Sequence, residues 1–149
     1  MADKLTKEAR SALMSRVRQS GTTPEVSLRK RLHAMGLRYT LNSKLLPGRP
    51  DLAFPRYGVA VFVHGCFWHG HSCRAGRSSS TNHDYWLQKI AANRLRDERK
   101  KAELLELGWR VMTVWECRTK GNRLDRTALD VAEFIQNSLS CTMELSRDT

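Results

Sequence analysis

The sequence has no long hydrophobic run, and we infer from this that no helix spans a membrane. Its longest apolar stretch covers residues 59–63, whereas a spanning helix needs roughly 20 such residues. The mean hydropathy of −0.53 agrees with this inference. No apolar segment follows the N-terminus either, so we expect no secretory signal. Together these absences predict a soluble, cytoplasmic protein.

Acidic residues are scarce beside basic ones. In total, 26 Lys and Arg residues stand against 15 Asp and Glu residues, which gives a net charge of +11 and an isoelectric point of about 10.1. So basic a domain is typical of proteins that bind a polyanion, with nucleic acid as the first candidate. The 149 residues suit a single domain, and the hydrophobic content of 40% is typical of a globular chain.

The sequence has only 4 cysteines and no C-x-x-C pair, so it lacks the commonest zinc-binding pattern. One short loop nevertheless collects His64, Cys66, His69, His71 and Cys73. Cys66, His71 and Cys73 suit zinc, because thiolate and imidazole ligands together select it. Cys117 is the candidate fourth ligand if its strand lies beside the strand that precedes the loop. Unligated thiols are the alternative, and Cys141 is expected to be a bystander.

Hydrophobic spacing predicts an α/β fold with a mixed β-sheet flanked by helices. The predicted strands cover residues 51–54, 59–63 and 109–115, and the predicted helices cover 23–36, 84–107 and 125–139. Thr23 is the expected N-cap of the first of these helices. In the long helix, the side chains expected to face the core are Leu87, Ile90, Ala91, Leu95 and Leu105. A basic segment forms residues 1–20, the main domain covers 21–140, and residues 141–149 are predicted to be a polar tail.

Several polar residues suit phosphodiester chemistry. His64 and His69 could exchange protons near neutral pH, or each could merely satisfy a nearby backbone group. Asp51 opens a strand beside the helix that carries Glu25, and carboxylate oxygens are what Mg²⁺ needs for phosphodiester hydrolysis. A Pro-Asp pair also commonly starts a turn, so this signal is weak by itself.

Three aromatic residues lie in or beside basic segments. Phe67, Trp68 and Trp86 could stack on nucleic-acid bases or wedge between them. They could instead belong to the core, and for Trp86 the core is favoured because it lies on a helix close to Leu87 and Ile90.

Five segments of the sequence resemble a known family. They read PGRPD (47–51), HGCFWHGHSC (64–73), WLQKI (86–90), LGWRV (107–111) and VWEC (114–117). In order and spacing they are similar to the very short patch repair (Vsr) DNA mismatch endonucleases, from about residue 7 to the last helix. The resemblance implies a fold like that of type II restriction endonucleases, with residues 1–20 as a DNA-contacting arm and 21–140 as the endonuclease domain.

The resemblance implies an activity and a set of catalytic residues. The family nicks one DNA strand 5′ of the thymine in a T·G mismatch, which arises when 5-methylcytosine deaminates. Asp51 and the backbone carbonyl of Val63 would bind Mg²⁺, and His69 would be the general base or acid. Glu25 and His64 would hold metal-bound waters. Asp97 would orient a catalytic histidine.

The same resemblance implies a structural zinc ion and an aromatic wedge. Cys66, His71, Cys73 and Cys117 would hold the zinc. Phe67, Trp68 and Trp86 would enter the base stack beside the mismatch, and Met14 would reach in from the other groove. The partner would be double-stranded DNA with a T·G mismatch, bound by a monomer that is associated with the nucleoid in the cytoplasm.

Two segments depart from related patterns. Restriction enzymes carry an acid and a lysine on the second strand, where this chain has Val61, Phe62, Val63 and His64. The loop 74–82 does not match the family pattern well, which leaves the sequence context of the mismatch open. Two other hypotheses are a zinc-stapled DNA-binding module without catalysis, and a nuclease of the same chemistry that accepts other mismatches.

Overall fold

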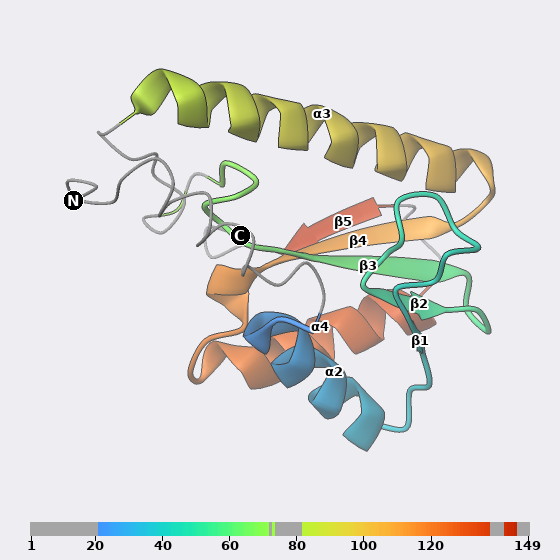
Figure 1. Cartoon of the computed structure of the whole chain (residues 1–149). Helices are drawn as coiled ribbons and strands as arrows, with labels where there is room; N and C mark the ends of the chain where they lie inside the picture. The colour runs from blue at the N-terminus through green and yellow to red at the C-terminus, as the bar shows by residue number, and fades with distance from the viewer. Residues whose placement is uncertain (1–20, 72, 74–81, 138–141, 146–149) are drawn as a thin grey trace.

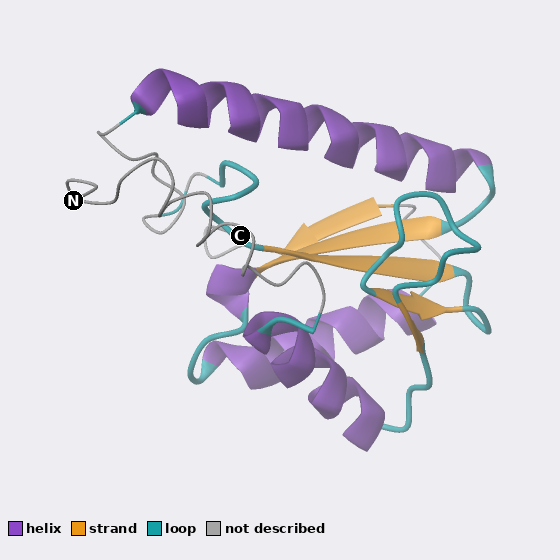
Figure 2. Cartoon of the chain, in the orientation of Figure 1, coloured by secondary structure: helices purple, strands orange, loops and turns teal. Residues whose placement is uncertain are grey.

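The fold is a five-stranded mixed sheet with helices on both faces (Figures 1 and 2). The computed structural model describes residues 21–71, 73, 82–137 and 142–145. The strands, in sheet order, are β1 (Thr40–Leu41), β2 (Leu52–Phe54), β3 (Val59–His64), β4 (Arg110–Trp115) and β5 (Thr142–Leu145). Helix α3 (His83–Glu106) crosses one face, and α2 (Thr23–Ala34) and α4 (Arg123–Gln136) cover the other. The predicted mixed sheet flanked by helices is confirmed.

The pairing of β3 with β4 determines where the His- and Cys-rich loop after β3 lies. β2 and β3 form the predicted antiparallel hairpin, with Ala53 opposite Ala60. β3 and β4 are parallel, and their register ends with His64 opposite Trp115. Parallel neighbours need a long crossover, which α3 supplies. Because both strands end at the same edge, the loop after β3 begins beside the short 3₁₀ helix η2 (Glu116–Arg118).

Alternation along β3 divides its side chains between two faces. Val59 and Val61 join the larger core with α2 and α4, whereas Ala60 and Phe62 pack beneath α3 with Leu104. His64 continues the α3 side of this alternation. The last residue of β3 therefore presents its imidazole toward the long helix.

The inward face of α3 differs from the prediction. Leu87, Ala91 and Leu95 are exposed, and Leu95 is 70% exposed. The inward positions are instead Trp86, Ile90, Asn93, Asp97, Lys100 and Leu104, which recur every three or four residues. Half of this stripe is polar because the helix crosses a polar cleft as well as the sheet. Hydrophobic spacing is therefore correct for Ile90, which is buried, and for Leu105, which packs partly buried against the core, but wrong for the other three residues.

Smaller differences concern the ends of elements. α2 begins at Thr23 with Thr22 as its N-cap, one residue before the predicted cap. Residues 142–145, expected in a polar tail, form β5 and pair with β4, whose open edge supplies backbone hydrogen-bond partners. The short strand β1 was not predicted. The basic segment of residues 1–20, with Met14, lies outside the described residues, as does Cys141.

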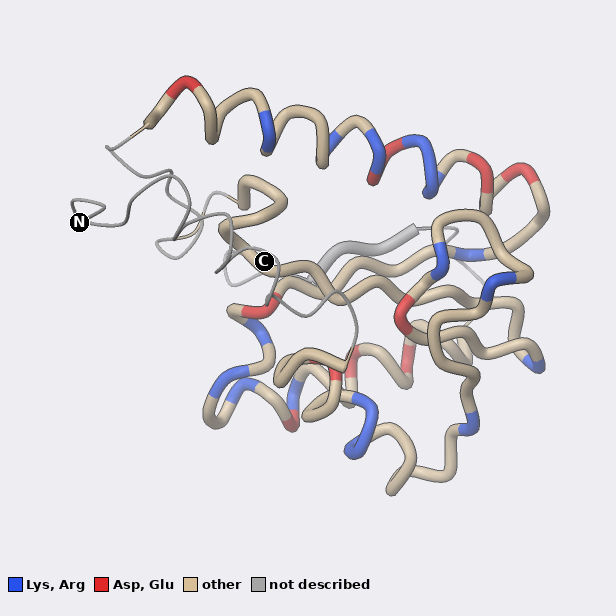
Figure 3. The backbone as a smooth tube through the Cα atoms, viewed as in Figure 1, with Lys and Arg blue, Asp and Glu red and all other residues tan. Residues whose placement is uncertain are grey.

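Basic residues lie on α2, α3, α4 and the loop between β1 and β2 (Figure 3). Within the described residues, no helix is both long enough and apolar enough to cross a membrane.

Candidate active site and metal centre

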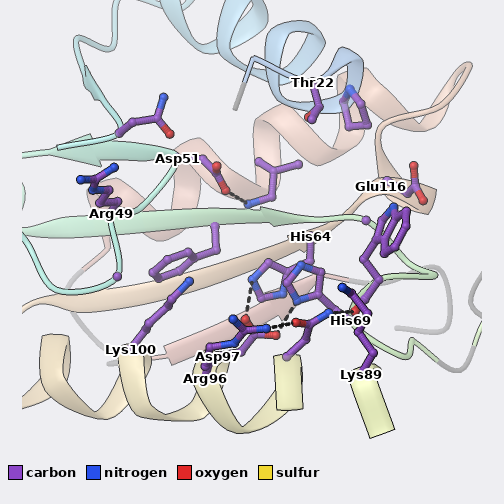
Figure 4. Close-up of a pocket in the computed structure, with 18 residues that line it drawn as sticks. Thr22, Arg49, Asp51, His64, His69, Lys89, Arg96, Asp97, Lys100 and Glu116 are labelled. Carbon is purple, nitrogen blue, oxygen red and sulfur yellow. Dashed lines mark hydrogen bonds and ion pairs between the residues drawn. The ribbon is translucent and has the colours of Figure 1, made fainter. Parts of the chain in front are cut away.

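A polar cleft of about 720 Å³ lies between α3 and the end of β3 (Figure 4). Its walls bring together Asp51 from the start of the hairpin, His64 from β3, His69 from the next loop and Asp97 from α3. These are four of the five residues predicted to be catalytic. The fifth, Glu25, lies at the start of α2 and acts electrostatically on Asp51.

Asp51 is held in a form that favours protonation. Its Oδ2 accepts a hydrogen bond from the Val63 N–H at 2.7 Å, which ties the carboxylate to β3. Burial raises the pKa of Asp51 to about 7, although the hydrogen bond from Val63 opposes the shift. The charge of Glu25 acts in the same direction as burial. A nearby cation would restore the ionised form, so the site fits a carboxylate that binds a metal.

Glu25 is a buried acid with one unsatisfied oxygen. Its side chain is 1% exposed, and its Oε2 accepts a hydrogen bond from the Gly21 N–H at 2.7 Å. Among the described residues, its Oε1 has no hydrogen-bond partner, although Arg29 lies at 3.6 Å. A buried oxygen of this kind normally accepts a hydrogen bond, from the protein or from an ordered water. Hard carboxylate oxygens, with water, are the donors that Mg²⁺ prefers, so this acidic pair fits that ion.

The two cleft histidines share one carboxylate. The rings of His64 and His69 are stacked, with centroids 4.0 Å apart and planes 3° apart. His69 Nδ1 lies 2.5 Å from Asp97 Oδ2, and His64 Nε2 lies 3.9 Å from Asp97 Oδ1. In-plane lone pairs of parallel rings cannot converge on one ion. The geometry therefore favours proton exchange over shared metal binding.

Electrostatics separate the roles of the two histidines. Burial, together with the charge of His69, lowers the pKa of His64 to about 3, so His64 is neutral. Burial alone would raise the pKa of Asp97, but the hydrogen bond from His69 and the nearby positive charges outweigh it and lower that pKa. Because Asp97 is ionised, His69 Nδ1 donates to it. Nε2 of His69 is then the nitrogen available to exchange a proton.

A second cluster lies beside this cleft and contains all four predicted zinc ligands. The ligand atoms of Cys66, His71, Cys73 and Cys117 lie within 4.8 Å of one another, and the side chains are buried. Among the described residues these three cysteines form no disulfide, and burial raises the pKa of Cys66. Three sulfurs and one imidazole nitrogen could hold a metal ion, and this donor set suits zinc. Cys117 joins the cluster because β3 and β4 are neighbours, as the prediction required.

The three predicted wedge residues pack on one another. Ring centroids are 5.2 Å apart for Phe67 and Trp68, 5.1 Å for Phe67 and Trp86, and 5.8 Å for Trp68 and Trp86. Trp86 is only 5% exposed, whereas Phe67 and Trp68 are half-buried. Trp68 lines the cleft, and its carbonyl accepts a hydrogen bond from Asn93 Nδ2 at 2.7 Å. Trp86 is thus the buried member of the group, and the other two rings pack on it.

Two residues that the sequence analysis missed connect the clusters. The Trp115 ring stacks on His71 at 4.4 Å and meets His64 edge-on at 5.3 Å. Glu116 Oε1 accepts a hydrogen bond from the Cys66 N–H at 2.9 Å. Both lie in the VWEC segment (114–117), which was the available signal for their positions.

Comparison with known proteins identifies the family. Residues 2–75 match the family model described as DNA mismatch endonuclease Vsr. The chain is 51% identical over 117 residues to the type II nicking enzyme V.XorIIP of Xanthomonas oryzae pv. oryzae (strain KACC10331 / KXO85), covering 78% of this chain and 86% of that protein. This chain belongs to the Vsr family of DNA mismatch endonucleases. The predicted resemblance is confirmed.

One further comparison agrees with the Vsr assignment, and another concerns the fold alone. The DNA mismatch endonuclease Vsr of Escherichia coli (strain K12) is 41% identical over 121 residues, covering 81% of this chain and 78% of that protein. The catalytic domain of homing endonuclease I-Bth0305I has a similar fold, with a TM-score of 0.52 over 80% of this chain and all of that domain, at 21% identity. As a member of the Vsr family, the chain is a DNA endonuclease.

Proposed function

We propose that this protein nicks one strand of duplex DNA 5′ of the thymine in a T·G mismatch, and so initiates very short patch repair of deaminated 5-methylcytosine. The observation that carries the proposal is the meeting of Asp51 with the histidine pair in one cleft of a Vsr-family chain. The substrate would be double-stranded DNA, bound by a monomer.

Mg²⁺ would be held beside Asp51. Asp51 and the backbone carbonyl of Val63 would be its direct ligands, and Glu25 and His64 would hold its waters. The bound ion would supply charge neutralisation at the phosphate and a more acidic water. The desolvated Asp51 carboxyl and the unsatisfied Glu25 oxygen fit this assignment.

His69 would move the proton. In hydrolysis, a water oxygen bonds to phosphorus, one phosphate ester bond breaks, and the leaving oxygen gains a proton. Nε2 of His69 would take up the proton that the attacking water loses, or deliver one to the leaving oxygen, while its Nδ1–H donates to Asp97. Asp97 would keep the ring oriented and would stabilise its charged form. Neutral His64, stacked on His69, would restrain the ring plane.

The second cluster and the aromatic group would have structural and recognition roles. Zinc at Cys66, His71, Cys73 and Cys117 would fasten the loop after β3 to η2. Phe67 and Trp68, supported by Trp86, would enter the base stack beside the mismatch, with Met14 approaching from the other groove.

Strand-resolved cleavage tests this function. Wild-type protein with Mg²⁺ is incubated with duplexes that contain each possible mismatch or none, each strand carrying its own label. We expect one nick, 5′ of the thymine, in the T·G duplex alone. Retention of DNA without cleavage would support the non-catalytic module, and nicks at many mismatches would support the nuclease of looser specificity.

A further inference from the structure

Four basic side chains line the cleft, and one of them differs from the rest. Arg49, Lys89 and Arg96 are exposed, whereas Lys100 is half-buried on the inward face of α3. Figure 4 shows its side chain rising from α3 toward β3. Lys100 is thus the cleft cation that is most shielded from solvent.

The loop before Asp51 packs directly on the aliphatic part of this lysine. Gly48 has φ of +75°, and a Cβ there would lie only 2.5 Å from Lys100 Cγ and 2.7 Å from its Cβ and Cδ. These atoms are near the backbone and cannot easily move aside. Glycine is therefore required both for the left-handed backbone and for the contact. The contact restrains the lysine stem and keeps its ammonium at the cleft.

The Lys100 ammonium faces acidic and catalytic groups without pairing with one of them. In the described part of the chain it forms no ion pair and no hydrogen bond. Its charge nevertheless acts on Asp51, His64 and Asp97. Ordering a long cationic side chain costs conformational entropy, and a shielded charge without a partner is unfavourable. An anionic ligand in the cleft would supply the missing partner.

We propose that Lys100 is a catalytic residue, and that its ammonium contacts a non-bridging oxygen of the phosphate that is cleaved. This inference rests on the proposed function. Negative charge builds on that oxygen as water attacks, so a fixed cation stabilises the transition state more than the bound substrate. Restriction enzymes carry a lysine on the second strand, but this chain has none between Val61 and His64. Lys100 would supply the positive charge instead, from α3 on the opposite wall of the cleft.

Two variants separate the charge of Lys100 from its packing. Lys100→Met keeps an unbranched stem under Gly48 but removes the charge, and Lys100→Arg keeps the charge. Lys101→Met is the matched control, since Lys101 is the next residue of α3 and does not line the cleft. We expect Lys100→Met to lower the single-turnover nicking rate about 10²–10³-fold, as loss of one transition-state donor does. We expect Lys100→Arg to retain more activity than Lys100→Met, and Lys101→Met to nick at about the wild-type rate.

A binding cycle tests the contact without cleavage. T·G duplexes carrying either the normal phosphate or a neutral methylphosphonate 5′ of the thymine are bound in EDTA by wild type and Lys100→Met. If Lys100 touches that phosphate, the two changes together weaken binding no more than one of them alone, because they remove the same interaction. Additive losses would overturn the inference.

The outcomes distinguish this inference from the proposed function. A wild-type protein that fails to nick the T·G duplex contradicts the function, while the binding cycle still reports on the contact. A wild-type protein that nicks, together with Lys100→Met at an unchanged rate, contradicts the role of Lys100 alone. Thermal melting of both Lys100 variants tests whether they fold. If Lys100→Met is unfolded, Lys100→Gln takes its place in the same assays.

Discussion

Asp51 has surroundings that disfavour its negative charge. An aspartate in the unfolded chain ionises near its ordinary pKa of 3.8, whereas the pKa of folded Asp51 is raised to about 7. Between these values the unfolded state binds fewer protons than the folded state, so this group lowers stability as pH rises. The destabilisation is complete above the folded pKa and absent below the unfolded one. Such strain at a cleft carboxylate is consistent with a role in binding a cation.

The Asp51→Asn variant should separate stability from activity. Without divalent metal, we expect it to melt at a higher temperature than wild type at about pH 8, and the difference to vanish near pH 4. In Mg²⁺ it should bind T·G duplex and fail to nick it, because the metal ligand is lost. Thermal melting across pH and a cleavage assay measure both effects. Nicking at the wild-type rate would place the metal elsewhere.

Trp68 and Trp86 provide a paired test of the aromatic wedge. Base stacking on an aromatic side chain is worth about 1–3 kcal/mol, so Trp68→Ala should reduce the preference for T·G over T·A duplex by that amount. Trp68 is half-buried, and we expect the variant to fold. Trp86→Ala, at a residue only 5% exposed, should instead cost about 3–5 kcal/mol of folding free energy.

Thermal melting beside paired binding assays separates the two roles. An unchanged preference for T·G over T·A duplex in a folded Trp68→Ala protein would refute the wedge. An unchanged melting temperature for Trp86→Ala would contradict its role as the buried residue that supports the other two rings.

At the scale of elements, the loop after β3 and the end of β4 meet at the Cys/His cluster. Cys66, His71 and Cys73 come from the loop, whereas Cys117 comes from η2. Metal held by both segments would couple metal binding to folding. The same end of β4 supplies Trp115, which contacts His71 and His64, so order in the Cys/His cluster would support order in the stacked histidine pair.

Cys117→Ser should therefore lower both the zinc content of the purified protein and its melting temperature. A chelator that removes the metal should lower the melting temperature of wild type by a similar amount. Both treatments remove the metal-mediated connection between the loop after β3 and η2. Cys141→Ser serves as the matched control and should change neither quantity. Elemental analysis beside calorimetry gives the answer, and wild-type protein purified without bound zinc would contradict the assignment.

At the scale of the whole molecule, positive charge is spread over several elements rather than confined to one helix (Figure 3). With a net charge of +11, the protein should bind duplex largely through phosphate contacts. For about 6–10 such contacts, the affinity should fall about 10³–10⁵-fold between roughly 50 and 200 mM salt. A titration at several salt concentrations measures the slope. A flat response would show that the basic residues lie away from the bound DNA.

The sequence alone determined the class of fold and the chemistry of the ligands. Strand periodicity located β2, β3 and β4, and the His- and Cys-rich loop indicated the candidate metal-binding cluster. These signals are local, since alternation, turn residues and ligand type are properties of neighbouring residues. The family motifs are local for the same reason.

Only the tertiary structure decided which distant residues meet. The parallel register of β3 and β4 brings Cys117 to the loop cysteines, and the placement of α3 brings Asp97 to His69 and Lys100 to the loop at Gly48. α3 turns a half-polar stripe inward because it covers a cleft, and this contradicts the hydrophobic pattern that sequence analysis relies on. The pKa of Asp51 likewise depends on burial by several elements at once, which no local pattern encodes.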